Sequence, residues 1–157
     1  MENKKKILFI CLGNICRSSA AEEIMRQKLI DAGKGNEIIV DSAGLIDYHE
    51  GEKSDPRMLS HAYLRGYRIT HLSRPISRKD FQTQDLIIGM DDSNIMRLRQ
   101  MARGETELSK IHKITEYSKN YSPEIIPDPY YSNDSAFEHV LDLLEDACNG
   151  LLEELLN

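Results

Sequence analysis

The sequence predicts an α/β fold in which one domain, residues 1–157, is built on a four-stranded parallel sheet with helices on both faces. Short apolar runs alternate with longer stretches of helical periodicity, which is the pattern of strands joined by helical crossovers. Capping residues and glycines stand near the expected ends of the helical stretches. The chain is also long enough for one buried core, and it shows no linker, repeat or low-complexity segment.

The first half of the chain contains two expected strands and two expected helices. Lys6–Cys11 is predicted to be a strand because it contains the apolar run Ile-Leu-Phe-Ile. A helix is expected over residues 18–32, close to two glycines, and a second strand over residues 37–41, which are rich in β-branched side chains. The Asp-Pro pair that opens residues 55–65 predicts another helix, because aspartate caps a helix and proline fits its first turn.

The second half continues this alternation. Residues 85–90 and 110–114 are predicted strands, with a helix over residues 91–101 between them and a short helix or turn at residues 80–81. Asp134-Ser135 is expected to cap a final helix, whose apolar residues recur at helical spacing. These residues are Val140, Leu141, Leu144, Ala147 and Leu151.

Two longer irregular segments remain between these elements, residues 43–54 and residues 118–133. Functional side chains often lie on loops that a rigid scaffold positions. In a parallel sheet, ligands bind at the carboxyl ends of the strands. Both segments are therefore expected to form walls of a site at that edge.

The bulk composition excludes several classes of protein. The net charge is −6, which does not suggest a nucleic-acid partner. The apolar runs are too short for a membrane span or for a signal peptide, so no membrane association is expected. Three cysteines, an odd number, in a chain of this size indicate a reduced, cytoplasmic protein rather than a disulfide scaffold.

The segment Cys11–Ser18, with the sequence C-L-G-N-I-C-R-S, carries the clearest chemical signal. It is expected to form a tight turn between the end of a strand and the start of a helix, where backbone N–H groups converge and bind an oxyanion. The same positive field favours the thiolate form of a cysteine. Arg17 can grip two oxygens of a bound phosphate. A nucleophile aimed at phosphate indicates a phosphatase with a phosphocysteine intermediate.

This segment resembles the signature of the low-molecular-weight protein tyrosine phosphatases, which have a cysteine, five residues, an arginine and then serine or threonine. Two further segments match in order, Val-Asp-Ser-Ala-Gly at 40–44 and Asp-Pro-Tyr-Tyr at 128–131, so the resemblance covers nearly the whole chain. It implies a flavodoxin-like fold, of the phosphotyrosine phosphatase I type, with strand order 2-1-3-4. It also implies hydrolysis of phosphotyrosine in proteins without a cofactor or metal. A cognate tyrosine kinase is a candidate partner, and the oligomeric state is not implied.

The resemblance assigns the catalytic roles. Cys11 is the nucleophile, Arg17 holds the equatorial oxygens, and Asp128 is the general acid, whose backbone the flanking Pro127 and Pro129 stiffen. The remaining residues of the signature are expected to bind phosphate. The full phosphate-binding set is Leu12, Gly13, Asn14, Ile15, Cys16, Arg17 and Ser18.

Supporting roles follow for residues in and around this turn. Ser18 is expected to cap the helix and, by resemblance, to donate to the Cys11 sulfur. Gly13 is expected to give the turn conformational freedom, and Asn14 can adopt positive φ. By resemblance Asn14 also belongs to a polar network that fixes the turn. The other members of this network are Ser42, His71 and Glu22.

Aromatic and sulfur side chains complete the expected site. By resemblance Tyr48 and Tyr130 form walls of a slot for a phenyl phosphate, while Tyr131 fits a wall and simple packing equally well. Cys16 lies five residues from Cys11 and is the expected partner in a reversible, protective disulfide. Cys148 is expected to serve packing only.

Three other functions remain as alternatives. A thioredoxin-coupled arsenate reductase of the same fold would need further cysteines after the third strand, and residues 75–95 contain none. Phosphoarginine phosphatases of this fold prefer threonine where this chain has Ile15. A phosphate-binding module without activity would lack the nucleophile or the acid, and this chain has both.

Overall fold

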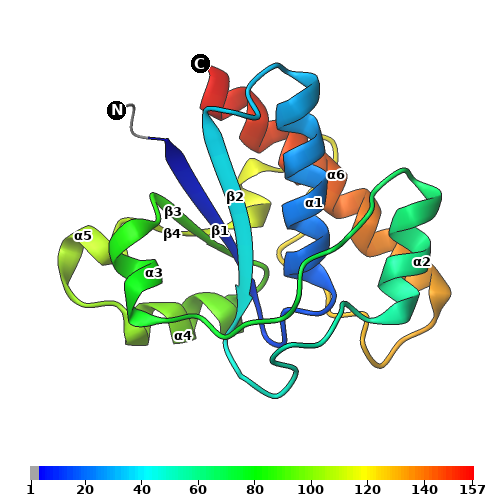
Figure 1. Cartoon of the computed structure of the whole chain (residues 1–157), viewed down its shortest axis with the longest axis horizontal. Coiled ribbons are helices and arrows are strands. Elements are labelled where there is room, and N and C mark those ends of the chain that lie inside the picture. The colour runs from blue at the N-terminus through cyan, green and yellow to red at the C-terminus, as the bar shows by residue number, and fades with distance from the viewer. Residues whose placement is uncertain (1–3) are drawn as a thin grey trace.

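The computed structural model describes residues 4–157 and confirms a single α/β domain (Figure 1). Its four strands are parallel and lie in the expected order, β2-β1-β3-β4. The strands are β1 (Lys5–Cys11), β2 (Ile38–Gly44), β3 (Leu86–Gly89) and β4 (Ile111–Lys113). The helices are α1 (Arg17–Asp31), α2 (Pro56–Leu64), α3 (Arg78–Thr83), α4 (Asp92–Met101), α5 (Gly104–Leu108) and α6 (Asp134–Leu156), with a 3₁₀ turn, η1 (Ile114–Tyr117).

The alternation of side chains along β1 separates two layers of core. Ile7 and Phe9 point into a large cluster with α1 and α6, whereas Leu8 and Ile10 point into a smaller cluster with α3 and α4. All four side chains are fully buried. Because successive residues of a strand face opposite sides, a continuous apolar run is the expected sequence of a strand covered on both faces. Figure 1 shows α1, α2 and α6 on one side of the sheet and α3, α4 and α5 on the other.

The structure corrects several expected boundaries. β2 continues to Gly44, three residues beyond its predicted end, because residues 42–44 pair with β1. The elements α5 and η1 were not predicted, since both are too short for a periodic pattern. Asn133, not Asp134-Ser135, caps α6, and its side chain accepts a hydrogen bond from the backbone N–H of Ala136. Within residues 4–157, no helix is both long and apolar enough to cross a membrane.

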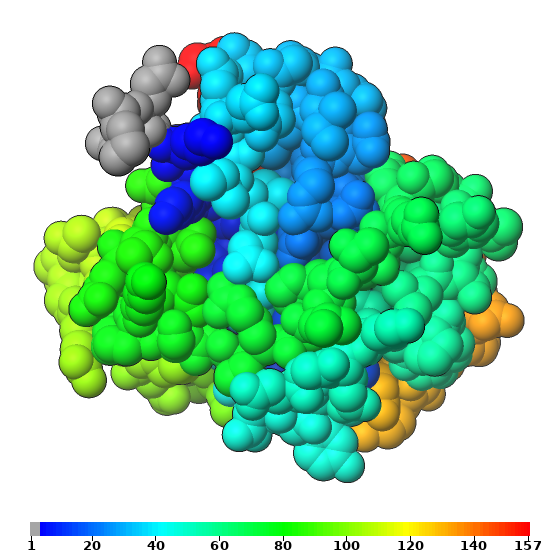
Figure 2. Space-filling view, in the orientation of Figure 1, coloured from blue at the N-terminus to red at the C-terminus, as the bar shows by residue number. Residues whose placement is uncertain are grey.

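The carboxyl ends of the strands meet at one edge of the sheet. Cys11 pairs with Gly44, and Ile10 pairs with Gly89. A Cβ atom on Gly44 would lie 3.0 Å from the carbonyl oxygen of Leu12, so the close approach of the next loop favours glycine here. Figure 2 shows the turquoise segment after β2 protruding next to the orange start of α6, at this same edge. Segments that are far apart in the sequence thus surround the end of β1.

Candidate active site

The cysteine loop, residues 11–18, joins the end of β1 to the first turn of α1. The carbonyl oxygens of Leu12, Gly13 and Ile15 each accept hydrogen bonds of 2.8–3.1 Å from neighbouring segments, which turns them outward. The N–H groups of residues 13–16 make no hydrogen bond to a protein acceptor within residues 4–157. Free N–H donors at the start of a helix form a binding site for an anion.

Cys11 is buried at the base of this loop, and its Sγ lies 3.0 Å from Ser18 Oγ. The expectation that Ser18 caps α1 is wrong, because the helix begins at Arg17 with Cys16 in the cap position and no side-chain cap bond. The Ser18 hydroxyl instead lies between the Cys11 sulfur and the Asn14 amide. It is therefore placed to stabilise negative charge on the sulfur.

The other two thiols have environments that disfavour ionisation. Burial, assisted by the negative charge of Asp55, raises the pKa of Cys16 far above its ordinary value. Burial also raises the pKa of Cys148, to about 12, in the core between α1 and α6. All three cysteines are free. Cys16 therefore stays a neutral thiol beside Cys11.

Arg17 is buried beneath the cysteine loop and is held by acidic groups. Its Nη1 donates to Asp91 Oδ2 at 2.7 Å and to the carbonyl oxygen of Ile126 at 2.9 Å, and its Nη2 lies 3.5 Å from Asp128 Oδ2. Burial by itself lowers the pKa of Arg17, but the negative charges of Cys11 and the two aspartates outweigh it and raise the pKa. Its Nε has no acceptor in residues 4–157, so this donor is available to a bound oxyanion.

Asn14 is the centre of the polar network behind the loop. It has φ of 58°, which confirms the expected positive φ. Its Nδ2 donates to Ser18 Oγ at 2.8 Å and to Ser42 Oγ at 3.0 Å. Its Oδ1 accepts from His71 Nε2 at 2.8 Å and from the backbone N–H of Arg74 at 3.0 Å. The amide therefore joins the cysteine loop to β2 and to the segment before α3.

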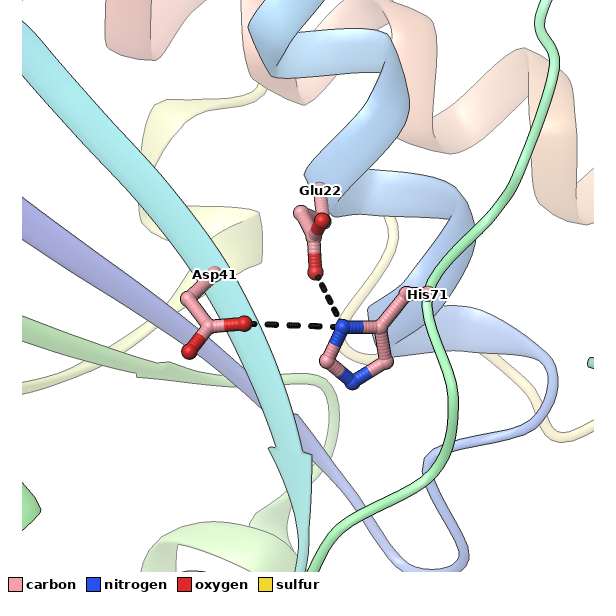
Figure 3. Close-up of side chains that lie close together, drawn as sticks. All are labelled: Glu22, Asp41 and His71. Atoms are coloured by element: carbon pink, nitrogen blue, oxygen red, sulfur yellow. Dashed lines mark ion pairs between the residues drawn. The ribbon is translucent and has the colours of Figure 1, made fainter. Parts of the chain in front are cut away.

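His71 lies between this amide and two carboxylates (Figure 3). Its Nδ1 is 3.1 Å from Glu22 Oε1 and 3.5 Å from Asp41 Oδ1. The bond from the backbone of Arg74 identifies the Asn14 oxygen, so His71 Nε2 must donate to it. Both ring nitrogens of His71 thus face hydrogen-bond acceptors.

Glu22, Asp41 and His71 are also close enough together to be considered as metal ligands. The carboxylates, however, already have cationic partners. Arg26 lies 2.6 Å from Glu22 Oε2, and Arg74 lies 2.9 Å from Asp41 Oδ2. Their charges are balanced by these guanidinium groups, so the cluster fits an ion-pair network around Asn14 better than it fits a metal site.

Asp128 reaches the same site from the segment before α6. Its Oδ1 accepts a hydrogen bond of 3.1 Å from the backbone N–H of Tyr130, which closes a short turn. Its Oδ2 lies 3.5 Å from Arg17 Nη2, and its side chain is 43% exposed. Cys11 and Asp128, which are 117 positions apart, line one cavity of about 310 Å³. This carboxylate is accessible to a ligand in the cavity.

Aromatic side chains form the mouth of this cavity. Tyr48, Tyr130 and Tyr131 line it as expected, with the Tyr130 and Tyr131 rings edge to face at 4.8 Å. His49 lines the same wall, and its ring centroid lies 4.8 Å from that of Tyr48. The φ of Gly13 is not positive, which corrects the expected role of this glycine; a Cβ there would instead lie 3.0 Å from the His49 ring. Tyr131 is 95% exposed, so packing alone does not explain it.

The structure adds residues that the sequence did not single out. Asp91 caps α4 with one carboxylate oxygen and holds Arg17 with the other. An aspartate directly after a predicted strand and before a helix was the available signal. Ile46 and His49 line the cavity from the irregular segment after β2, where no local pattern marked them. Leu12, Ile15 and Cys16 also line the cavity, whereas the supporting residues lie behind the loop. Those residues are Asn14, Ser18, Ser42, His71 and Glu22.

The family model described as low molecular weight phosphotyrosine protein phosphatase matches residues 6–157. The chain belongs to this family. It is 38% identical over 153 residues to the human low molecular weight phosphotyrosine protein phosphatase, covering 96% of this chain and 95% of that relative. Among solved structures of the phosphatases, that of the Entamoeba histolytica protein tyrosine phosphatase with Hepes in the active site has a TM-score of 0.94 and 39% identity, covering 97% of both chains. The Drosophila arginine phosphatase has a TM-score of 0.90 and 31% identity, covering 97% of this chain and 98% of that one.

Proposed function

We propose that this protein hydrolyses phosphotyrosine in proteins, and small aryl phosphates, through a phosphocysteine intermediate. The observation that carries the proposal is the convergence of Cys11, Arg17 and Asp128 on one cavity with a tyrosine-lined mouth. A nucleophile, an oxyanion clamp and a proton donor are the three groups that hydrolysis of a phosphate monoester requires. Family membership supports the same activity.

In the first step the thiolate of Cys11 attacks phosphorus while the N–H groups of residues 13–16 and Arg17 hold the phosphoryl oxygens. The S–P bond forms, and the bond between phosphorus and the tyrosyl oxygen breaks. The carboxyl group of Asp128 gives its proton to the departing oxygen, so tyrosine leaves as a neutral phenol. Asp91 keeps the guanidinium in place through its 2.7 Å bond.

In the second step a water molecule attacks the phosphorus of phosphocysteine. Asp128, now a carboxylate, takes a proton from this water. The S–P bond breaks, and its electron pair returns to the sulfur. Ser18 Oγ, 3.0 Å from the sulfur, stabilises the thiolate as it leaves. Inorganic phosphate is released, and Asp128 is again protonated for the next cycle.

The cavity also bears on the choice of substrate. Ile15 lines it with an apolar side chain at the position where phosphoarginine phosphatases prefer threonine. An apolar wall and aromatic rings suit the phenyl ring of phosphotyrosine better than a polar guanidino group. We therefore favour phosphotyrosine over phosphoarginine, although the arginine phosphatase has the same fold.

The proposal is tested with p-nitrophenyl phosphate, phosphotyrosine peptides and phosphoarginine, each in the presence of EDTA. We expect turnover of the two aryl substrates by the wild-type protein and none by Cys11→Ser, because a serine hydroxyl is too weak an acid to ionise in the loop. Cys11→Ser should still bind inorganic phosphate. Wild-type-like turnover by Cys11→Ser, or a requirement for a divalent cation, would contradict the mechanism.

The biological setting is part of the same proposal. The substrates are tyrosine-phosphorylated proteins, and a cognate tyrosine kinase is the candidate partner that produces them. The three free thiols fit a reducing compartment such as the cytoplasm. Comparison of the tyrosine phosphoproteome of cells with and without Cys11→Ser as a substrate trap would identify the targets.

A further inference from the structure

Arg57, in the first turn of α2, contacts the segment that carries Asp128. Its Nη2 donates to the carbonyl oxygen of Tyr130 at 2.8 Å, and its Nη1 donates to the carbonyl oxygen of Ser132 at 3.2 Å. The guanidinium also lies 4.7 Å from the centre of the Phe137 ring, at the start of α6. One side chain thus holds two carbonyl groups and an aromatic ring around the end of this segment.

Asp55 fixes the orientation of this guanidinium. Its Oδ1 accepts from Arg57 Nε at 3.1 Å, and its Oδ2 accepts from Nη2 at 2.9 Å, so the pair is bidentate. Asp55 also caps α2 and is itself buried. A rigid planar fork held on one side is able to position groups on its other side.

The same aspartate is bound to the cysteine loop. The backbone N–H of Asp55 donates to the carbonyl oxygen of Ile15 at 2.8 Å, and next to it Ser54 Oγ donates to Ser19 Oγ at 2.7 Å. The start of α2 is therefore attached to the loop that carries the nucleophile and, through Arg57, to the segment that carries the acid.

The contact at Tyr130 is directly coupled to the acid. The N–H of Tyr130 donates to Asp128 Oδ1, while its carbonyl oxygen accepts from Arg57. The backbone of this one residue is thus held at both ends, between the acid and the arginine. Loss of the arginine would free the turn that aims Asp128 and the ring of Tyr130.

We propose that Arg57 is a positioning residue that aligns Asp128 and Tyr130 with the cysteine loop. The proposal rests on the proposed role of Asp128 as the general acid. Arg57 does not touch the reacting atoms, and its effect is transmitted through the backbone of Tyr130. The substrate phosphate is held by other groups, so its binding does not depend on Arg57.

The test uses Arg57→Ala and a series of aryl phosphates whose leaving groups have graded pKa values. We expect kcat for phosphotyrosine to fall by about 10- to 100-fold, a part of the about 10²- to 10⁴-fold that a positioned acid contributes. Esters with acidic leaving groups should lose much less, because they depart without a proton. The inhibition constant of inorganic phosphate should stay within about twofold of the wild-type value, since its ligands are unchanged.

Arg65→Ala is the matched control. Arg65 directly follows the same helix and pairs with Glu138, Asp142 and Glu145 of α6, and within residues 4–157 none of its hydrogen bonds or ion pairs reaches residues 127–133. Its loss should lower stability without changing the dependence on the leaving group. Arg57→Lys, which keeps the charge and loses the planar fork, provides a second test if Arg57→Ala folds poorly.

Asp128→Asn and the double variant, Arg57→Ala with Asp128→Asn, separate the proposed role of Arg57 from the proposed role of Asp128. If Arg57 acts through the acid, the leaving-group dependence should steepen in both single variants and not steepen further in the double variant. The positioning role alone would be overturned if kcat depended more steeply on leaving-group pKa in Asp128→Asn but as in the wild type in Arg57→Ala and Arg57→Lys. An unchanged dependence in Asp128→Asn itself would overturn the proposed general acid.

Discussion

Replacement of Asn14 tests whether the backbone conformation of the cysteine loop or its hydrogen bonds dominate its stability. Asn14 is buried with φ of 58° and makes four hydrogen bonds. Asn14→Gly removes all four hydrogen bonds without backbone strain, because glycine adopts this φ angle readily. Asn14→Ala removes the same bonds and adds strain. Asn14→Asp keeps both acceptor contacts and tolerates the φ angle, but it loses the two donors.

The cost can be worked from the groups left without a partner. Ser18 and Ser42 keep their bonds to Cys11 and Glu22, whereas the ring N–H of His71 and the backbone N–H of Arg74 lose their acceptor. A buried donor without an acceptor costs about 1–3 kcal/mol; both are only partly buried, so the lower half of that range applies and Asn14→Gly should lose about 2–4 kcal/mol.

Alanine adds a second cost. An L side chain in the left-handed region costs about 1–2 kcal/mol. Glycine offsets part of this difference, because it loses about 0.5–1 kcal/mol more conformational entropy on folding. Strain is the larger of the two effects, so Asn14→Ala should be less stable than Asn14→Gly by about 1 kcal/mol.

Urea denaturation of the three variants measures these differences, and kcat with p-nitrophenyl phosphate measures the effect on catalysis. Asn14→Asp should be more stable than the other two yet reduced in activity, because its negative charge replaces the amide that orients Ser18. Equal stability of the glycine and alanine variants would refute the argument from backbone strain. Equal activity of Asn14→Asp and the wild type would refute the role of the amide donors.

Other predictions concern packing, pH and oxidation. A Cβ on Gly150 would lie 1.7 Å from the carbonyl oxygen of Tyr117. Gly150→Ala should therefore lower the free energy of unfolding by about 1–3 kcal/mol or more, which is the typical cost of overpacking. An unchanged melting temperature would contradict this prediction. Burial lowers the pKa of His61, but hydrogen bonds to two carboxylates of α6 outweigh it and raise the pKa above 6.5. The contribution of protonated His61 to stability should be complete below about pH 6.5 and should decline as pH rises through its folded-state pKa. The urea midpoints of His61→Gln and the wild type should therefore converge at high pH. A difference that stays constant with pH would contradict this prediction. Mild peroxide should give a Cys11–Cys16 disulfide in peptide maps, and Cys16→Ser should recover less activity with added thiol; equal recovery would remove the protective role.

Local patterns were sufficient for the strands and for the chemistry of the cysteine loop. The strand that ends at Cys11 contains a continuous apolar run, and the loop places cysteine, glycine and arginine within eight consecutive residues. Interactions within such a short segment depend on neighbours in the chain, so they are visible in the sequence. The role proposed for Asp128 came from resemblance, because an Asp-Pro pair by itself indicates only a turn.

Expectations failed where a local rule competed with a contact from a distant segment. Ser18 has the right residue type for a helix cap, but its hydroxyl is used by Cys11 and Asn14. Gly13 was expected to give the turn conformational freedom, but its φ is not positive, and the ring of His49 lies 3.0 Å from where a Cβ would stand. In both cases the residue type marked the position as unusual, but the local rule did not reveal which residue it contacts.

The sequence by itself indicated the four strands and the longer helices, and the loop that places a cysteine next to the start of a helix. Only the tertiary structure decided that Asp91 holds Arg17, that His49 joins the tyrosine wall, and that Arg57 contacts the segment of Asp128. These contacts join irregular segments many residues apart, where side chains follow no period. Their partners are set by the way the strand ends meet at one edge of the sheet, and no local pattern contains that information.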